Sequence, residues 1–145
     1  MRHTTRIAIL ILFGACLVSL LGSRPLSAQA CKDDEEIAKE EKKNLADIVE
    51  TVKKESLPDF QKSYHHRSCQ NKLTFCSGAV NRLLTCLDKA VQDTTADPED
   101  ISAYKAKRQT YGKLKDKIEE DRKALSGANS DKDAKAVIEK FNYSN

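Results

Sequence analysis

The chain has few of the residues that shape turns, sheets and large cores. Its 145 residues include no Trp, one Met, three Pro and five Gly. All-β domains need many turns rich in Gly and Pro, and this length leaves room for about one domain. The composition therefore argues against a β-sandwich, a β-barrel or a multi-domain enzyme, and it favours a small helical protein.

An excess of charge of one sign is also missing. Residues 1–30 hold three Arg and no acid, so the other 115 residues carry 22 bases and 22 acids. Proteins that bind nucleic acids through their surface usually carry a clear excess of bases, and disordered chains usually carry a high net charge. We therefore expect a folded protein without a nucleic-acid partner.

Long hydrophobic runs are absent except near the start of the chain. Residues 7–21 are apolar apart from one Ser, follow two Arg and precede Ala28 and Ala30. This order is typical of a secretory signal peptide, and a membrane-spanning helix needs a longer run, of roughly 20 residues. We predict a signal peptide over residues 1–30, cleaved after Ala30 or, as the second choice, after Ala28. A single helical domain would then cover residues 31–145.

The predicted location follows from this segment. A cleaved signal would make the protein secreted and extracellular, or periplasmic in a Gram-negative bacterium, without membrane contact. An uncleaved segment would instead anchor it. A lipid on Cys16 or Cys31 would make it a bacterial lipoprotein; Cys16 follows two small residues, but Phe13 stands where a lipobox has Leu.

Four cysteines remain after the predicted cleavage, namely Cys31, Cys69, Cys76 and Cys86. An even number in a short exported chain indicates two disulfides. Two helices folded back at Pro58 would bring Cys31 near Cys86 and leave Cys69 to pair with Cys76. Continuous helix would hold the last two α-carbons about 10.5 Å apart, beyond the limit of about 7 Å for a disulfide. This pairing therefore requires a break between them, and the pairings of Cys31 with Cys69 or Cys76 stay open.

The same residues permit two further interpretations. His65, Cys69, Cys76 and Cys86 are of the types that bind zinc, but their spacing matches no compact zinc module and an oxidising compartment favours disulfides. A nucleophile formed by Cys69 and His65 would need a free thiolate, which nothing in the sequence indicates. We expect no metal and no cofactor.

The spacing of apolar residues predicts four amphipathic helical segments. They cover about 33–56, 59–91, 98–125 and a short final helix from about 131, with an interruption of the second near 68–71 or 77–78. Asp97 before Pro98 is a strong signal for a helix start, and Gly127 is expected to end the third helix. The predicted fold is all-α, a small disulfide-stapled three- or four-helix bundle of up-down topology.

The second segment should be the central helix of the core. Its apolar stripe consists of Leu73, Cys76, Val80, Leu83, Leu84, Leu87 and Val91. The third segment has a thinner stripe, in which Tyr104, Tyr111, Ile118 and Leu125 follow one another at intervals of seven. Gly112 lies beside this stripe, where we expect it to let another helix approach closely.

Charge is distributed unevenly along the chain. Residues 31–50 hold eight acids and four bases, whereas residues 105–117 hold six bases and one acid. One interpretation is that the acidic and basic helices lie side by side. The other is a basic face for an anionic partner, formed by Lys105, Lys107, Arg108, Lys113, Lys115 and Lys117.

Sequence motifs of catalysis are absent, including a Gly-rich phosphate loop, H-E-x-x-H and G-x-S-x-G. We therefore predict that the protein is not an enzyme. It would be a secreted interaction module, such as an inhibitor, effector or signalling ligand, that binds an unidentified protein through a charged helix face. The alternatives are a carrier of a small apolar ligand inside the bundle and a structural component of an envelope or matrix. Asn142-Tyr143-Ser144 is a glycosylation sequon, relevant only in a eukaryote.

Overall fold

A computed structural model describes residues 26–144, and this part of the chain forms five α-helices without a strand. They are α2 (Leu26–Lys54), α3 (Leu57–Ser63), α4 (His65–Gln92), α5 (Pro98–Ser126) and α6 (Asp131–Ile138). The prediction of an all-α protein is confirmed for the described residues.

Helix α2 begins inside the predicted signal peptide. The cleavage positions predicted after Ala28 and Ala30 therefore fall within this helix, and residues 1–25 of the predicted signal lie outside the described part of the chain. None of the described helices is long and apolar enough to span a membrane.

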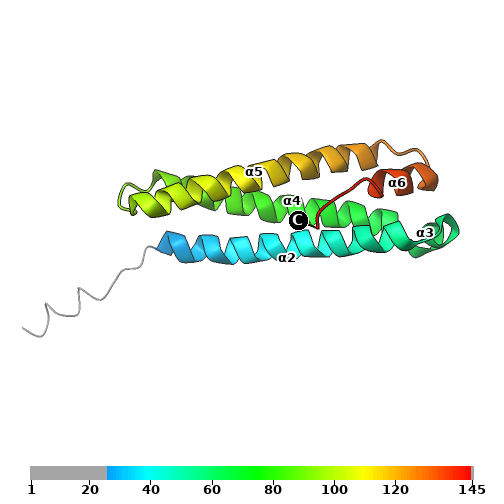
Figure 1. The fold of residues 1–145 in the computed structure, drawn as a ribbon, viewed down its shortest axis with the longest axis horizontal. Helices are drawn as coiled ribbons and strands as arrows, with labels where there is room; N and C mark the ends of the chain where they lie inside the picture. Colours follow the sequence, from blue (N-terminus) through cyan, green and yellow to red (C-terminus); the bar gives the residue numbers. More distant parts are fainter. Residues whose placement is uncertain (1–25, 145) are drawn as a thin grey trace, which may run out of the picture.

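The three long helices alternate in direction, with α4 between α2 and α5 (Figure 1). Helix α4 packs extensively against both neighbours, whereas α2 and α5 contact each other little. Short α6 lies at the same end of the bundle as α3 and also contacts α2, α4 and α5. The chain after α6 turns back between α2 and α5, so that a C-terminal tail closes the open side of a three-helix bundle (Figure 1).

Local side-chain caps explain where the helices begin. Ser56 accepts a hydrogen bond from the backbone N–H of Asp59, and Asp97 accepts one from Glu99. Ser130 caps α6 in the same way. Each cap satisfies a backbone N–H that the helix itself cannot, so the predicted starts of α5 and α6 are confirmed.

The predicted interruption of the second segment is placed wrongly. Helix α4 is continuous from His65 to Gln92, and the break lies earlier, at Tyr64. Tyr64 has a φ of 58°, in the left-handed region that non-Gly residues rarely occupy. It is 73% exposed, so the backbone turn between α3 and α4 is made without burying the tyrosine ring.

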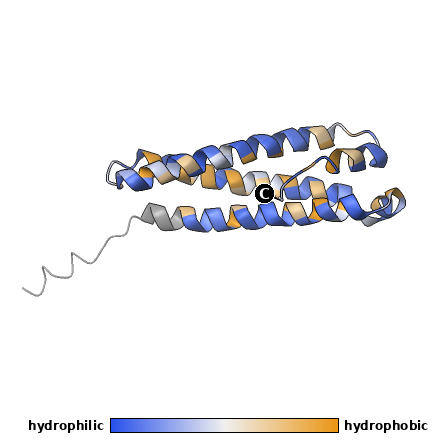
Figure 2. Ribbon diagram, in the orientation of Figure 1, coloured by the Kyte–Doolittle hydropathy of each residue, from blue (hydrophilic) through white to orange (hydrophobic). Residues whose placement is uncertain are grey.

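The core is built mainly from the inward side of α4. Leu73, Cys76, Val80, Leu83 and Leu87 are at most 1% exposed, whereas the predicted stripe members Leu84 and Val91 are only partly buried. Leu45, Val49 and Val52 of α2 and Ile118 and Leu125 of α5 join the same cluster. Figure 2 shows that α5 is hydrophilic over most of its length, which agrees with its thin apolar stripe.

Gly112 does not serve the close approach that its position predicted. A Cβ atom built there would meet no atom within 4 Å. The residue instead lines an open cleft between α4 and α5. That expectation is therefore wrong, because no other helix packs against the position that a Cβ of residue 112 would occupy.

Candidate functional site

The six bases predicted to form one face of α5 do not share a face. Three of them form ion pairs: Lys107 with Glu35 of α2, Arg108 with Asp88 of α4, and Lys117 with Asp121 of α5 itself. Lys105, Lys113 and Lys115 form no ion pair with the described residues. Since successive helix residues are rotated by about 100°, Lys107 and Lys117 lie on the flank toward α2 and the C-terminal tail. The expectation of one continuous face of six is corrected accordingly.

The remaining four bases are spread over two sides of α5: Lys105 and Lys113 are exposed on the side away from the core, and Arg108 and Lys115 lie on the flank toward α4. We call Lys105, Arg108, Lys113 and Lys115 together the outer face of α5. Arg108 and Lys115 line a cleft of about 400 Å³ between α4 and α5. Asn81 and Thr85 of α4 form its opposite wall, together with Asp88. The cleft thus combines guanidinium, ammonium, amide and hydroxyl donors, which are the groups that bind carboxylates.

The ion pair of Glu35 shows why Lys107 is not part of this face. Burial by itself would raise the pKa of Glu35, but the hydrogen bonds from Lys107 and Lys39 outweigh it and hold the pKa below the ordinary value. Glu35 therefore stays charged at neutral pH. Its side chain is only 13% exposed, so Lys107 is held between α2 and α5 by a partly buried partner.

A buried polar cluster fastens the C-terminal tail to α5. The hydroxyl of Tyr143 donates a hydrogen bond to Oδ2 of Asp121, and Nζ of Lys117 donates to the same oxygen at 2.9 Å. The Lys117 ammonium also lies 4.9 Å from the centre of the Tyr143 ring, within range of a cation–π contact. Burial and the bond to Asp121 both raise the pKa of Tyr143 above its ordinary value. The cluster is a structural anchor, because its charges satisfy one another.

The cysteines follow the predicted pairing only in part. Cys31 and Cys86 form a disulfide with an S–S distance of 2.03 Å and join the start of α2 to the end of α4. Cys69 and Cys76 are free and buried. The predicted bond between them is wrong, because α4 runs through both residues without the break that the bond requires, and continuous helix holds their α-carbons about 10.5 Å apart.

The two free thiols have little reactivity at neutral pH. Burial, with a smaller contribution from Asp121, raises the pKa of Cys69 to about 12. Burial and Glu41 raise the pKa of Cys76 to about 11. Because the thiolate is the reactive form, both side chains behave at neutral pH as small apolar residues of the core.

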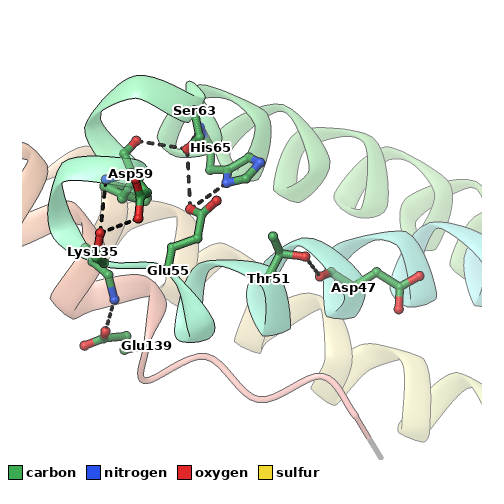
Figure 3. Close-up of polar contacts among 10 residues, drawn as sticks. Asp47, Thr51, Glu55, Asp59, Ser63, His65, Lys135 and Glu139 are labelled. Atoms are coloured by element: carbon green, nitrogen blue, oxygen red, sulfur yellow. Dashed lines mark hydrogen bonds and ion pairs between the residues drawn. The ribbon is translucent and has the colours of Figure 1, made fainter.

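His65 is engaged in the bend that joins α2, α3 and α4. Its Nδ1 lies 2.8 Å from Oε2 of Glu55, and the hydroxyl of Ser63 points to the same carboxylate at 3.4 Å (Figure 3). The hydroxyl hydrogen-bonds to the carboxylate and not to the imidazole, so the arrangement lacks the order of a nucleophile triad. The proposed zinc set is not assembled, since Cys86 is in the disulfide, and the described residues contain no cluster suited to a metal ion.

Sequence reasoning missed the outward surface shared by α2 and α4, which we call the α2–α4 face. Phe75 of α4 is 61% exposed and Ile37 of α2 is 42% exposed. Ile48 and Phe75 line a groove of about 530 Å³ between the two helices. The signal for Phe75 was present in the sequence, because Phe75 falls outside the apolar stripe of its helix. Ile37 follows the spacing of the inward residues of its helix, so its 42% exposure differs from the pattern.

These observations leave two surfaces for a binding role, the outer face of α5 and the α2–α4 face. Leu73, Val80 and Leu83, around which a carrier of an apolar ligand would hold its ligand, belong to the buried core cluster. No family model, curated protein or solved structure matches the chain.

Proposed function

We propose that the protein is a small exported, non-enzymatic interaction module that binds an acidic surface of another protein through the outer face of α5. The supporting observation is that Lys105, Lys113 and Lys115 form no ion pair with a described residue. Groups of bases without counter-charges attract and orient an acidic partner.

Arg108 adds a site at which a partner's carboxylate could be held. Its ion pair with Asp88 is exposed on both sides, at 56% and 46%, and exposed pairs contribute only about 0–1 kcal/mol. A carboxylate of a partner can therefore replace Asp88, or bind Arg108 beside it, at little cost in free energy. A guanidinium also binds carboxylates in a bidentate manner, so Arg108 would supply the specificity and the three Lys the attraction.

The experiment uses immobilised polyglutamate as a defined acidic protein surface. Wild-type protein should be retained and should elute with rising salt, because the interaction is between exposed charges. The variant Lys105→Gln/Lys113→Gln/Lys115→Gln should elute at clearly lower salt.

A matched control removes the same charge elsewhere. Lys32, Lys54 and Lys62 are exposed and unpaired with the described residues, so Lys32→Gln/Lys54→Gln/Lys62→Gln changes net charge equally without touching α5. It should elute close to wild type. Equal shifts of both variants would mean that retention depends on net charge alone and would contradict a specific face.

A further inference from the structure

The α2–α4 face carries a row of apolar side chains on an otherwise polar surface, in which Ile37 and Phe75 are exposed and Ile48 is partly buried. Ile37 and Ile48 are separated by about three turns of α2 and so lie on one side of it, and Phe75 projects from α4 beside Ile48. Exposed apolar groups that gather on one surface mark interaction sites, whereas scattered ones do not. We therefore expect a partner molecule to bind over this row and bury it.

The edge of the row on α2 is mainly acidic, although exposed Lys43 and Lys54 lie on the same stripe. Asp33, Glu36, Glu40 and Asp47 are all exposed, and their spacings of three, four and seven residues place them on one outward stripe of α2. None of the four forms an ion pair with a described residue.

The helix on the other side of the row is basic. Arg67, Arg82 and Lys89 are exposed on the outward side of α4 and form no ion pair with a described residue. The single acid of α4 is Asp88, which turns toward α5 and pairs with Arg108. The α2–α4 face is thus acidic along one edge, apolar in the middle and basic along the other edge.

A surface with this order of charges is complementary to a copy of itself. A two-fold axis parallel to the helices places α2 of each copy over α4 of the other, so that acids meet bases along both edges and the apolar rows meet in the centre. A two-fold axis across the helices would place α2 over α2 and oppose acids with acids. We propose that the α2–α4 face binds a second copy of this chain in the first of these arrangements.

The internal contacts of one chain fix which charges would meet. The Cys31–Cys86 disulfide and the approach of Lys72 to Glu41 at 3.6 Å set the level of α2 against α4. Rotation about a two-fold axis parallel to the helices leaves the position of each residue along the helix direction unchanged. Arg82 of one copy therefore lies at the level of Asp33 of the other copy.

The size of the face suits a stable dimer. Helices of 29 and 28 residues are about 42 Å long at 1.5 Å per residue. Two such helices side by side are about 20 Å wide, so the face offers about 800 Å² on each copy, which is the area per partner of a standard interface. The outer face of α5 stays uncovered, so this inference does not depend on the proposed function.

Charge reversal tests the dimer and its orientation together. Wild-type protein at high concentration should sediment with twice the mass of one chain. Arg67→Glu/Arg82→Glu should be monomeric because acids then face acids, and Asp33→Lys/Asp47→Lys should be monomeric because bases then face bases. An equimolar mixture of the two variants should recover the dimer, since each α2 again meets an α4 of opposite charge.

Two further samples complete the experiment. Phe75→Ser should weaken the dimer while keeping the helical circular dichroism, because the side chain is exposed in the single chain. Lys105→Glu/Lys113→Glu, on the outer face of α5, should remain dimeric and serves as the matched control. A monomeric wild type, or a mixture of the reversed variants that stays monomeric, would overturn the proposal.

Discussion

The hydroxyl of Tyr143 donates a 2.5 Å hydrogen bond to Asp121, 22 residues earlier in the chain. Asp121 is 9% exposed and Tyr143 is 4% exposed, so the hydrogen bond is largely shielded from solvent. It connects a tail that has no regular structure to the C-terminal part of α5. Phe141 packs edge-on against Tyr143, and the tail is therefore part of the fold.

Replacing Tyr143 by Phe should lower the free energy of unfolding by about 1–3 kcal/mol, the usual result of leaving a buried polar group without its partner. The ring and its contact with Phe141 are kept, so the loss reports the hydroxyl alone. Urea denaturation followed by circular dichroism measures it. Ser144→Ala, at an exposed position in the same tail, is the control and should change little; equal effects of the two variants would contradict the anchoring role.

The stability of the wild type relative to Tyr143→Phe should depend on alkaline pH. The folded state holds the pKa of Tyr143 above the ordinary value of 10, so the contribution is fully present below pH 10. Above that pH the unfolded chain ionises first, and the wild type loses up to about 1.4 kcal/mol per pH unit relative to the variant. Urea denaturation of both proteins at a series of pH values tests this. A difference in urea midpoint that does not change with pH would show that the hydroxyl is not held neutral by the fold.

Cys69 and Cys76 should resist alkylation in the native protein and react quickly in urea. Burial and pKa values of about 12 and about 11 leave almost no accessible thiolate at pH 8. Intact mass after iodoacetamide treatment should show no adduct on native protein and two on unfolded, unreduced protein. No adduct under the second condition would mean that these cysteines are joined, and rapid labelling of native protein would mean that α4 is not closed over them.

Removing the disulfide should be the most damaging single change to stability. The bond closes a loop with a sequence separation of 55 residues, for which the chain-entropy relation gives roughly 4 kcal/mol. Cys31→Ala/Cys86→Ala should therefore shift the urea midpoint strongly downward. Wild type in a reducing agent should match the variant, because Cys69 and Cys76 have no bond to lose. A reduced wild type much less stable than the variant would point to a second disulfide.

The sequence predicted what local interactions determine. The starts of α5 and α6 followed from Asp97, Pro98 and Ser130, whose caps need only the next three residues. The break at Tyr64 could not be found in this way, because a left-handed tyrosine has no sequence signal comparable to Gly or Pro. The error over Cys69 and Cys76 has the same origin, since the break was sought where the disulfide required one.

The candidate surfaces depended on where the helices lie around one another. Six bases within 13 residues of α5 necessarily point in several directions, and only the positions of α2 and α4 decide which find acids. Lys107 meets Glu35 across the bundle, whereas Lys105, two residues earlier, meets no acid in the described chain. The docking of Tyr143 was also unpredictable. Asp121 falls between Ile118 and Leu125 on the apolar stripe of α5, and the sequence does not show which polar group meets its carboxylate there.

Because of the position of the disulfide, different parts of the molecule differ in their resistance to a pulling force. It links the second turn of α2 to a point about two turns before the end of α4, so a pull applied between Cys31 and the C-terminus passes through the sulfur atoms and bypasses residues 32–85. Only the chain after Cys86 can lengthen, which means the end of α4, α5, α6 and the tail. Under tension, the charged helix and its tail would peel away while the hairpin kept its form, and reduction would release the remaining length in a second event.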